Sequence, residues 1–110
     1  MIINYKILND NTYDDVYKIL NKNSLINLIQ GYKYLSQLDC KSGFWQIRLD
    51  EESKTWATFL CPCGLYEWNV MSFGLKNVPQ IFQRMKDDIF SQCSFVLVYI
   101  DDILIFSHTF

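Results

Sequence analysis

The stretch Phe95-Val-Leu-Val-Tyr-Ile-Asp-Asp-Ile-Leu-Ile-Phe-Ser107 decides the fold. Two apolar runs rich in β-branched residues enclose Asp101 and Asp102, and each run has the length of a strand. The four residues Tyr99 to Asp102 are enough to reverse the chain, so we predict a β-hairpin. Asp is a common turn residue, but these flanks are apolar enough to be buried on both faces. Two carboxylates at the edge of such a core repel each other and are costly to desolvate, which indicates a cation partner.

Asp39 supplies a third carboxylate. It ends the strand-like segment that starts at Tyr34, and a Lys-Ser-Gly turn follows it closely. If this segment lies beside the hairpin in one antiparallel sheet, three carboxylates meet at one place. Oxygen ligands favour a hard cation such as Mg²⁺. Two such ions, about 3.5–4 Å apart, would hold the attacking and leaving oxygens of an in-line phosphoryl transfer.

The remaining patterns predict short helices and short strands. Asn23 and Ser24 are suited to cap a helix from Leu25 to Gln30, and Gly31 to end it in a left-handed turn. In the segment from Phe44 to Leu49, side chains suited to a buried face alternate with side chains suited to a solvent-exposed face, which predicts a strand.

The middle of the chain predicts a helical turn followed by a hairpin. The segment Asp50-Glu-Glu-Ser53 suits the first turn of a short helix, because its carboxylates meet the positive end of the helix dipole. Two extended runs, Trp56 to Leu60 and Leu65 to Val70, flank the Cys61-Pro-Cys-Gly64 turn.

The most regular helix is predicted after Asn77, which can cap it with Pro79 in the first turn. Its spacing predicts an apolar side made of Val78, Ile81, Phe82, Met85, Ile89 and Cys93. Asp87 and Asp88 lie elsewhere on this helix, where we expect them to be solvated.

The composition is that of one domain at most, or of a piece of one. The chain has 110 residues, half of them apolar, with net charge −2 and a pI near 5.2. No apolar run approaches the roughly 20 residues of a membrane helix, and no secretory signal is evident. We therefore expect an intracellular protein with reduced cysteines. The Cys61-Pro-Cys63 spacing does not match a zinc site.

Four motifs in order resemble the reverse transcriptases of long-terminal-repeat retroelements and plant pararetroviruses, most closely the caulimovirus-like branch. They are Ile3-Asn-Tyr-Lys-x-Leu-Asn9, Leu38-Asp-Cys-Lys-Ser-Gly-Phe-Trp-Gln-Ile47, the run from Tyr66 to Arg84, and Tyr99-Ile-Asp-Asp102. Together they cover nearly the whole chain. The departures, such as Ser72 in Met-Ser-Phe-Gly-Leu and Val78 before Pro79, remove no catalytic carboxylate.

The resemblance implies the roles of the acidic residues and of their neighbour. Asp39, Asp101 and Asp102 would be catalytic metal ligands, the first two bridging two Mg²⁺ ions, for which Mn²⁺ can substitute. Asp102 would assist the ion that activates the primer 3′-hydroxyl, and Tyr99 would touch the primer end.

The resemblance also implies a nucleotide site. Phe44 would crowd the sugar 2′ position and select deoxynucleotides, while the amides of Ser42 and Gly43 would hold the triphosphate. The incoming nucleotide and the template strand would be lined by Phe73, Gly74, Leu75 and Lys76. The alternatives are that Phe44 is an ordinary core residue and Lys76 a solvated cation.

The implied architecture is α+β: an antiparallel sheet with packed helices, forming the palm of a right-hand polymerase with part of the fingers. Residues 1–33 would be the fingers-side segment and residues 34–110 the palm core. A basic residue that holds the triphosphate is expected before Met1, and only eight residues follow Asp102, so the thumb is expected outside this chain. We expect the isolated chain to be inactive or nearly so.

The parent enzyme would act on a primed RNA or DNA template and deoxynucleoside triphosphates, in the cytoplasm or a virus-like particle and not at a membrane. One rival is a decayed or co-opted retroelement remnant that serves as a binding or structural module. A second is an RNA-dependent RNA polymerase, but such enzymes usually have Gly before the paired Asp, where this chain has Tyr99-Ile100.

Overall fold

The computed structural model describes residues 3–110 and divides into two compact units. The first unit joins the N-terminal segment up to Asp15 with Ser42–Pro79, and the second joins Val16–Lys41 with Gln80–Phe110. Each unit draws on both predicted parts, 1–33 and 34–110, whose assignment to fingers and palm stays a prediction. None of the helices in residues 3–110 has the length and apolar character needed to span a bilayer.

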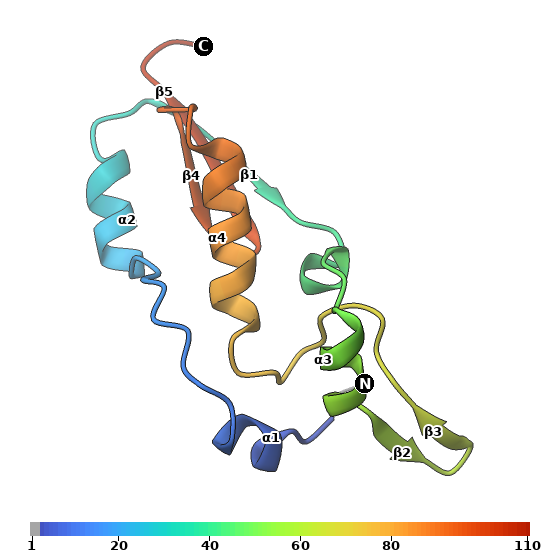
Figure 1. Ribbon diagram of the computed structural model, residues 1–110. Coiled ribbons are helices and arrows are strands. Elements are labelled where there is room, and N and C mark those ends of the chain that lie inside the picture. Colours follow the sequence, from blue (N-terminus) through green and yellow to red (C-terminus); the bar gives the residue numbers. More distant parts are fainter. Residues whose placement is uncertain (1–2) are drawn as a thin grey trace. The chain divides into compact units, whose positions relative to one another are not determined.

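The second unit is built on a three-stranded antiparallel sheet with the order β1-β5-β4 (Figure 1). Its strands are β1 (Tyr34–Asp39), β4 (Val96–Tyr99) and β5 (Asp102–Ser107). The predicted hairpin is confirmed, since Tyr99 pairs with Asp102 and the chain reverses between them. β-branched and aromatic side chains favour this pleated arrangement.

The sheet is less buried than its apolar sequence predicts. Every residue of β4 is half-buried, Phe106 is the buried residue of β5, and β1 is exposed along its whole length. The expectation of burial on both faces was therefore wrong. A sheet of three strands has two edges, and β1 and β4 each have a strand on one side only.

Two helices belong to the second unit for most of their length, α2 (Lys22–Ile29) and α4 (Val78–Phe90). Helix α2 begins earlier than predicted because Asn21, rather than Asn23 or Ser24, accepts the capping bond from the Ser24 amide at 2.8 Å. Gly31 has a φ of +94°, which confirms the left-handed turn after this helix.

Helix α4 is confirmed in position, but its buried side differs from the predicted one. Phe82 is fully buried together with the polar residues Gln83 and Lys86, whereas Ile81 and Ile89 are exposed. The apolar spacing was misleading because the polar groups of Gln83 and Lys86 find partners in the sheet. Asp87 is also not merely solvated, since it accepts hydrogen bonds from Gln83 and Tyr17.

The first unit contains short elements: α1 (Lys6–Asp10), the 3₁₀ helix η1 (Gly43–Gln46), α3 (Glu51–Trp56), β2 (Phe59–Cys61) and β3 (Gly64–Tyr66). The hairpin around Cys61-Pro-Cys-Gly64 and the helical turn after Asp50 are confirmed. The predicted strand from Phe44 to Leu49 is wrong, because Ser42 takes a left-handed backbone with a φ of +60° and starts a 3₁₀ turn. Trp56 ends α3 instead of starting a strand.

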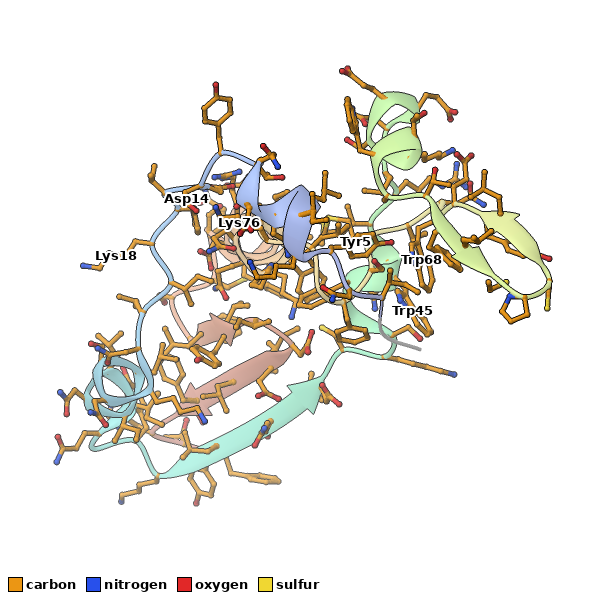
Figure 2. The ribbon with its side chains drawn as sticks, turned by 90° about the horizontal axis from the view of Figure 1, so that it is seen from below. Tyr5, Asp14, Lys18, Trp45, Trp68 and Lys76 are labelled. Atoms are coloured by element: carbon orange, nitrogen blue, oxygen red, sulfur yellow. The ribbon has the colours of Figure 1, made fainter. Side chains whose placement is uncertain are left out.

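The core of the first unit is aromatic. Tyr5, Phe44, Ala57 and Met71 are buried, and the Tyr5 hydroxyl donates to the Ala57 carbonyl at 2.8 Å. Trp45 and Trp68 stack with ring centroids 6.2 Å apart; Figure 2 labels both of them together with Tyr5. The Tyr5 hydrogen bond thus ties the N-terminal segment to the end of α3, and the tryptophan stack holds η1 against the segment after β3.

Candidate functional site

The backbone brings Asp39 and Asp102 face to face. They are partners in the register of β1 and β5, and the Cys40 amide donates to the Asp101 carbonyl at 2.9 Å. This bond pattern makes Asp39 and Asp102 a narrow, non-hydrogen-bonded pair, whose Cα atoms lie about 4.5 Å apart. Opposed residues project from the same face of a sheet, so their carboxylates are neighbours.

Asp101 lies in the tight turn that joins β4 to β5. Ile100 and Asp101 are its two central residues, and Ile100 has a φ of +50°. A positive φ at the first central position alone is the pattern of a type II′ turn, which normally has Gly there. A β-branched residue in this conformation is strained, so the surrounding structure must hold it.

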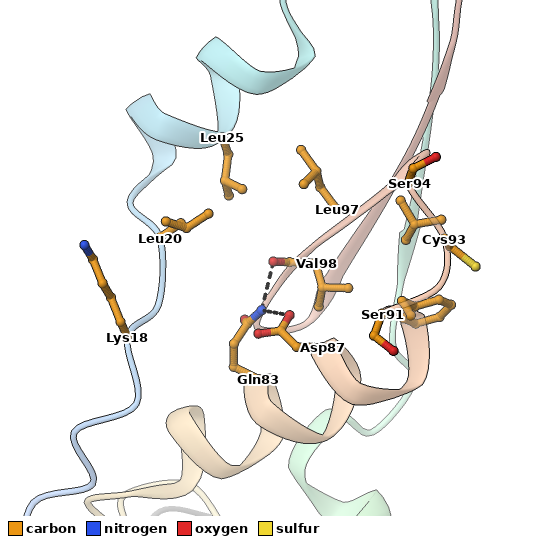
Figure 3. A pocket seen from close by; sticks show the side chains of 12 residues that line it. Lys18, Leu20, Leu25, Gln83, Asp87, Ser91, Cys93, Ser94, Leu97 and Val98 are labelled. Atoms are coloured by element: carbon orange, nitrogen blue, oxygen red, sulfur yellow. Dashed lines mark hydrogen bonds between the residues drawn. The ribbon is translucent and has the colours of Figure 1, made fainter.

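Helix α4 holds the strained turn through Gln83. The Gln83 Oε1 accepts from the Ile100 amide at 2.6 Å, and its Nε2 donates to the Val98 carbonyl and to Asp87, each at 2.9 Å. Figure 3 shows the last two bonds beside a cavity of about 300 Å³. Lys86, one turn further along, donates to the Ile100 carbonyl. Both polar groups of Ile100 are therefore fixed by α4.

The Asp101 carboxyl in this turn has a shifted pKa. Burial raises the pKa of the Asp101 carboxyl, and the carboxylates of Asp39 and Asp102 raise it further, while Lys86 lowers it. The Oδ1 atom of Asp101 is buried and has no hydrogen-bond partner. Asp102, in contrast, accepts a hydrogen bond from Gln37 at 3.0 Å. One carboxylate oxygen at the tip is thus available for a ligand.

The three carboxylates share one end of the sheet without forming a ready-made metal cage. Among residues 3–110, no group of three or more His, Cys, Asp or Glu side chains is arranged to hold a metal ion. The Asp39 side chain is exposed, and Tyr99 is half-buried next to Asp102 in the register.

The candidate nucleotide-binding residues lie in the first unit. Ser42 has the left-handed backbone that starts η1, and Gly43 and Phe44 are buried within it. The Phe44 ring lies 5.4 Å from the ring of Phe73, centroid to centroid. Phe73 is half-exposed, at 49%. Phe44 is therefore part of the core of this unit, while Phe73 presents its ring to solvent.

Gly74 and Lys76 contact the N-terminal segment. Gly74 has a φ of +94°, and an added Cβ would lie 3.2 Å from the Ile3 carbonyl oxygen. The Lys76 ammonium pairs with Asp14 at 2.8 Å and donates to the Thr12 carbonyl at 3.1 Å; Figure 2 labels Lys76 and Asp14. Lys76 is thus an ion-paired side chain, not the solvated cation of the alternative interpretation.

Sequence reasoning missed Gln83 and Lys86. The predicted apolar side of the helix includes neither of them, although both are almost fully buried, at 4% and 3% exposure. A signal was present in their position, because they lie three residues apart and Lys86 lies one helical turn from Phe82. What they bond to depends on the turn at Ile100.

Comparison with known proteins adds the family. The family model described as "Reverse transcriptase (RNA-dependent DNA polymerase)" matches residues 1–109. The chain belongs to the reverse transcriptase family. It is 52% identical over 109 residues to the enzymatic polyprotein of cauliflower mosaic virus (strain Strasbourg), covering 98% of this chain and 16% of that protein. It is 51% identical to polyprotein P3 of Commelina yellow mottle virus, covering 99% of this chain and 6% of that protein.

The fold matches that of solved reverse transcriptases. The native prototype foamy virus protease-reverse transcriptase aligns with a TM-score of 0.87 at 26% identity, covering 99% of this chain and 15% of that chain. A foamy viral protease-reverse transcriptase in complex with double-stranded DNA aligns with a TM-score of 0.92 at 22% identity, covering 99% and 19%. The α+β architecture expected from the sequence is confirmed, and the chain spans only 15% and 19% of the length of these two solved chains.

Proposed function

We propose that this chain is the palm segment, with part of the fingers, of an RNA-directed DNA polymerase that adds deoxynucleotides to a primer 3′-hydroxyl by two-metal phosphoryl transfer. The observation that carries the proposal is the facing of Asp39 and Asp102 across β1 and β5, with Asp101 beside them in the turn. Membership of the reverse transcriptase family supports it.

The donor atoms fit divalent cations. Carboxylate oxygens are the ligands that Mg²⁺ and Mn²⁺ prefer, and the buried Oδ1 of Asp101 lacks any other partner. The exposed Asp39 side chain is free of packing that would prevent a rotamer change. When bound, such ions lower the pKa of the attacking hydroxyl and neutralise charge on the leaving group. The carboxylates of Asp39, Asp101 and Asp102 would hold these ions.

The nucleotide site is proposed on the first unit. The backbone amides of Ser42 and Gly43 would bind the triphosphate. The buried Phe44, packed against Phe73, has the rigidity that a steric gate against a 2′-hydroxyl requires. Lys76 would reach a nucleotide or template strand only by exchanging its contact with Asp14.

A primed template is the proposed nucleic-acid partner. Solved relatives include a foamy viral protease-reverse transcriptase in complex with an RNA/DNA hybrid. The chain spans 16% of the cauliflower mosaic virus polyprotein, and we propose that the isolated 110 residues bind metal but do not extend primers at a measurable rate.

Metal binding is tested by titrating the chain with Mn²⁺ and measuring free Mn²⁺ by electron paramagnetic resonance. The wild type is expected to bind Mn²⁺, and Asp39→Asn to lose most of that binding. Asp88→Asn is the matched control, because Asp88 is an exposed carboxylate of α4 outside the site. Equal binding by the wild type and Asp39→Asn would refute the proposed site and favour a non-catalytic module.

Polymerase chemistry is tested in a chimera. In it, the 110 residues of this chain replace the matching segment of the cauliflower mosaic virus polyprotein. The chimera is expected to extend a primer with deoxynucleotides, and Asp101→Asn to abolish extension. Phe44→Ala is expected to increase ribonucleotide incorporation relative to deoxynucleotide incorporation. An active chimera whose nucleotide preference is unchanged by Phe44→Ala would refute the gate while leaving the carboxylate site intact.

A further inference from the structure

Lys86 is a buried cation that the proposed chemistry does not use. Lys86 belongs to α4 and is only 3% exposed. Its ammonium lies 4.3 Å from the centroid of the ring of Phe82, which is fully buried. The ammonium donates to the Ile100 carbonyl. An ammonium removed from water loses its hydration, and a single carbonyl and an aromatic face replace only part of it. Nearby negative charge therefore stabilises the Lys86 ammonium.

That negative charge lies at the next residue along the chain. Asp101 follows Ile100, so the Lys86 ammonium that donates to the Ile100 carbonyl lies beside the residue that carries this carboxyl. Burial and the carboxylates of Asp39 and Asp102 raise the pKa of Asp101, and Lys86 lowers it. The buried Oδ1 of Asp101 has no hydrogen-bond partner. Lys86 thus supplies the positive charge that makes three neighbouring carboxylates tolerable when no other cation is bound.

We propose that Lys86 is a built-in counter-ion of the carboxylate cluster, which stabilises the metal-free turn and opposes the binding of divalent cations. This inference rests on the proposed function, because it concerns the same cluster. A positive charge beside a site for a divalent cation repels that cation. The Lys86 ammonium also donates to the Ile100 carbonyl and so positions the strained turn in the metal-free chain. Lys86 is therefore a positioning residue, and its charge sets the concentration of divalent cation at which the site fills.

The proposal predicts two effects of opposite sign when the charge is removed. Lys86→Met removes the charge and the hydrogen bond, while Lys86→Gln removes the charge and keeps a donor for the Ile100 carbonyl. Without metal, in EDTA, both variants are expected to unfold at a lower temperature than the wild type. Both are also expected to bind Mn²⁺ about tenfold more tightly, because the repulsion is gone. A purely structural lysine would instead lower stability and Mn²⁺ affinity together.

The experiment uses the 110-residue chain, thermal unfolding in EDTA, and Mn²⁺ titration followed by electron paramagnetic resonance. Lys22→Met is the matched control, because Lys22 is an exposed lysine of α2, and it should change neither quantity. Mn²⁺ affinity at or below that of the wild type in both Lys86 variants would overturn the proposal. If either variant is unfolded in EDTA, recovery of the fold on adding millimolar Mn²⁺ supports the proposal, and failure to recover overturns it.

The two proposals fail separately. If the wild type binds Mn²⁺ and Asp39→Asn binds it equally well, the proposed carboxylate site is refuted. Mn²⁺ binding that depends on Asp39 but does not tighten in the Lys86 variants would remove only the role of Lys86.

Discussion

Replacing Gln83 by Met tests whether α4 holds the strained turn. Met has a similar volume and no amide, so Gln83→Met removes three hydrogen bonds and fills the same space. The three partners are the Ile100 amide, the Val98 carbonyl and the Asp87 carboxylate. The Asp87 carboxylate keeps its hydrogen bond from the Tyr17 hydroxyl, so losing the bond from Gln83 costs little stability there. The two backbone groups, the Ile100 amide and the Val98 carbonyl, lose the Gln83 amide as their hydrogen-bond partner.

The expected loss of stability follows from those two backbone groups. A buried polar group left without a partner costs about 1–3 kcal/mol, which gives about 4 kcal/mol for the pair. Relaxation of the left-handed Ile100 returns about 1 kcal/mol, since backbone strain of this kind stores energy. The net loss is about 3 kcal/mol. This is a large part of the 5–15 kcal/mol that stabilises a typical domain, and it corresponds to a fall in Tm of about 15 °C.

Urea unfolding followed by far-ultraviolet circular dichroism measures the loss, and hydrogen exchange of the Ile100 amide locates it. Gln92→Met is the control, because Gln92 is exposed in the same unit, and it should change the free energy of unfolding by less than about 0.5 kcal/mol. The Ile100 amide is expected to exchange faster in Gln83→Met alone. If Gln83→Met is as stable as the control, the argument that Gln83 holds the turn is wrong.

Three other changes test separate features of the chain. Gly74→Ala should destabilise it more than Gly31→Ala does, as measured by urea unfolding. Both glycines have a φ of +94° and share about 1–2 kcal/mol of left-handed strain, but only at Gly74 would the new Cβ meet a carbonyl oxygen, at 3.2 Å; equal losses would contradict that contact. Asp101→Asn should raise Tm at pH 7 in EDTA and not at pH 3. Burial raises the pKa of the Asp101 carboxyl, so the stability present below its unfolded-state pKa is lost as the pH rises through its folded-state pKa; a gain of equal size at both pH values would exclude this cause. The hydrogen bond to Asp87 raises the pKa of Tyr17 to about 12. The stability from this bond is therefore complete below about pH 10 and lost as the pH approaches 12, and Asp87→Asn should return the Tyr17 pKa toward its ordinary value in an NMR titration, where an unchanged pKa would refute the assigned bond.

The strained turn and the crowded carboxylates are features that stability alone would not favour. Ile100 takes a conformation that suits Gly, and Asp101 is half-buried beside two like charges. Both are held in place by Gln83 and Lys86. Strain concentrated beside reactive groups is typical of functional sites, which agrees with the proposed role of the turn in metal-dependent chemistry.

Local patterns in the amino-acid sequence were sufficient for the β4–β5 hairpin, the left-handed turn at Gly31 after α2 and the position of α4. These features depend on neighbours within a few residues: a run of β-branched side chains, a glycine with positive φ, a proline in a first helical turn. The ordered motifs were sufficient for the reverse transcriptase family, since no single motif would have been specific.

Tertiary structure decided the rest. The pairing of Asp39 with Asp102 joins residues 63 positions apart, and strand alternation alone does not specify a partner strand. The segment after Ser42 became a 3₁₀ turn because a left-handed residue and packed aromatic rings overrode its alternation. Gln83 and Lys86 are buried because the turn at Ile100 offers their polar groups partners. Hydrophobic periodicity records which side chains avoid water, and it carries no information on which distant backbone groups will satisfy a buried polar one.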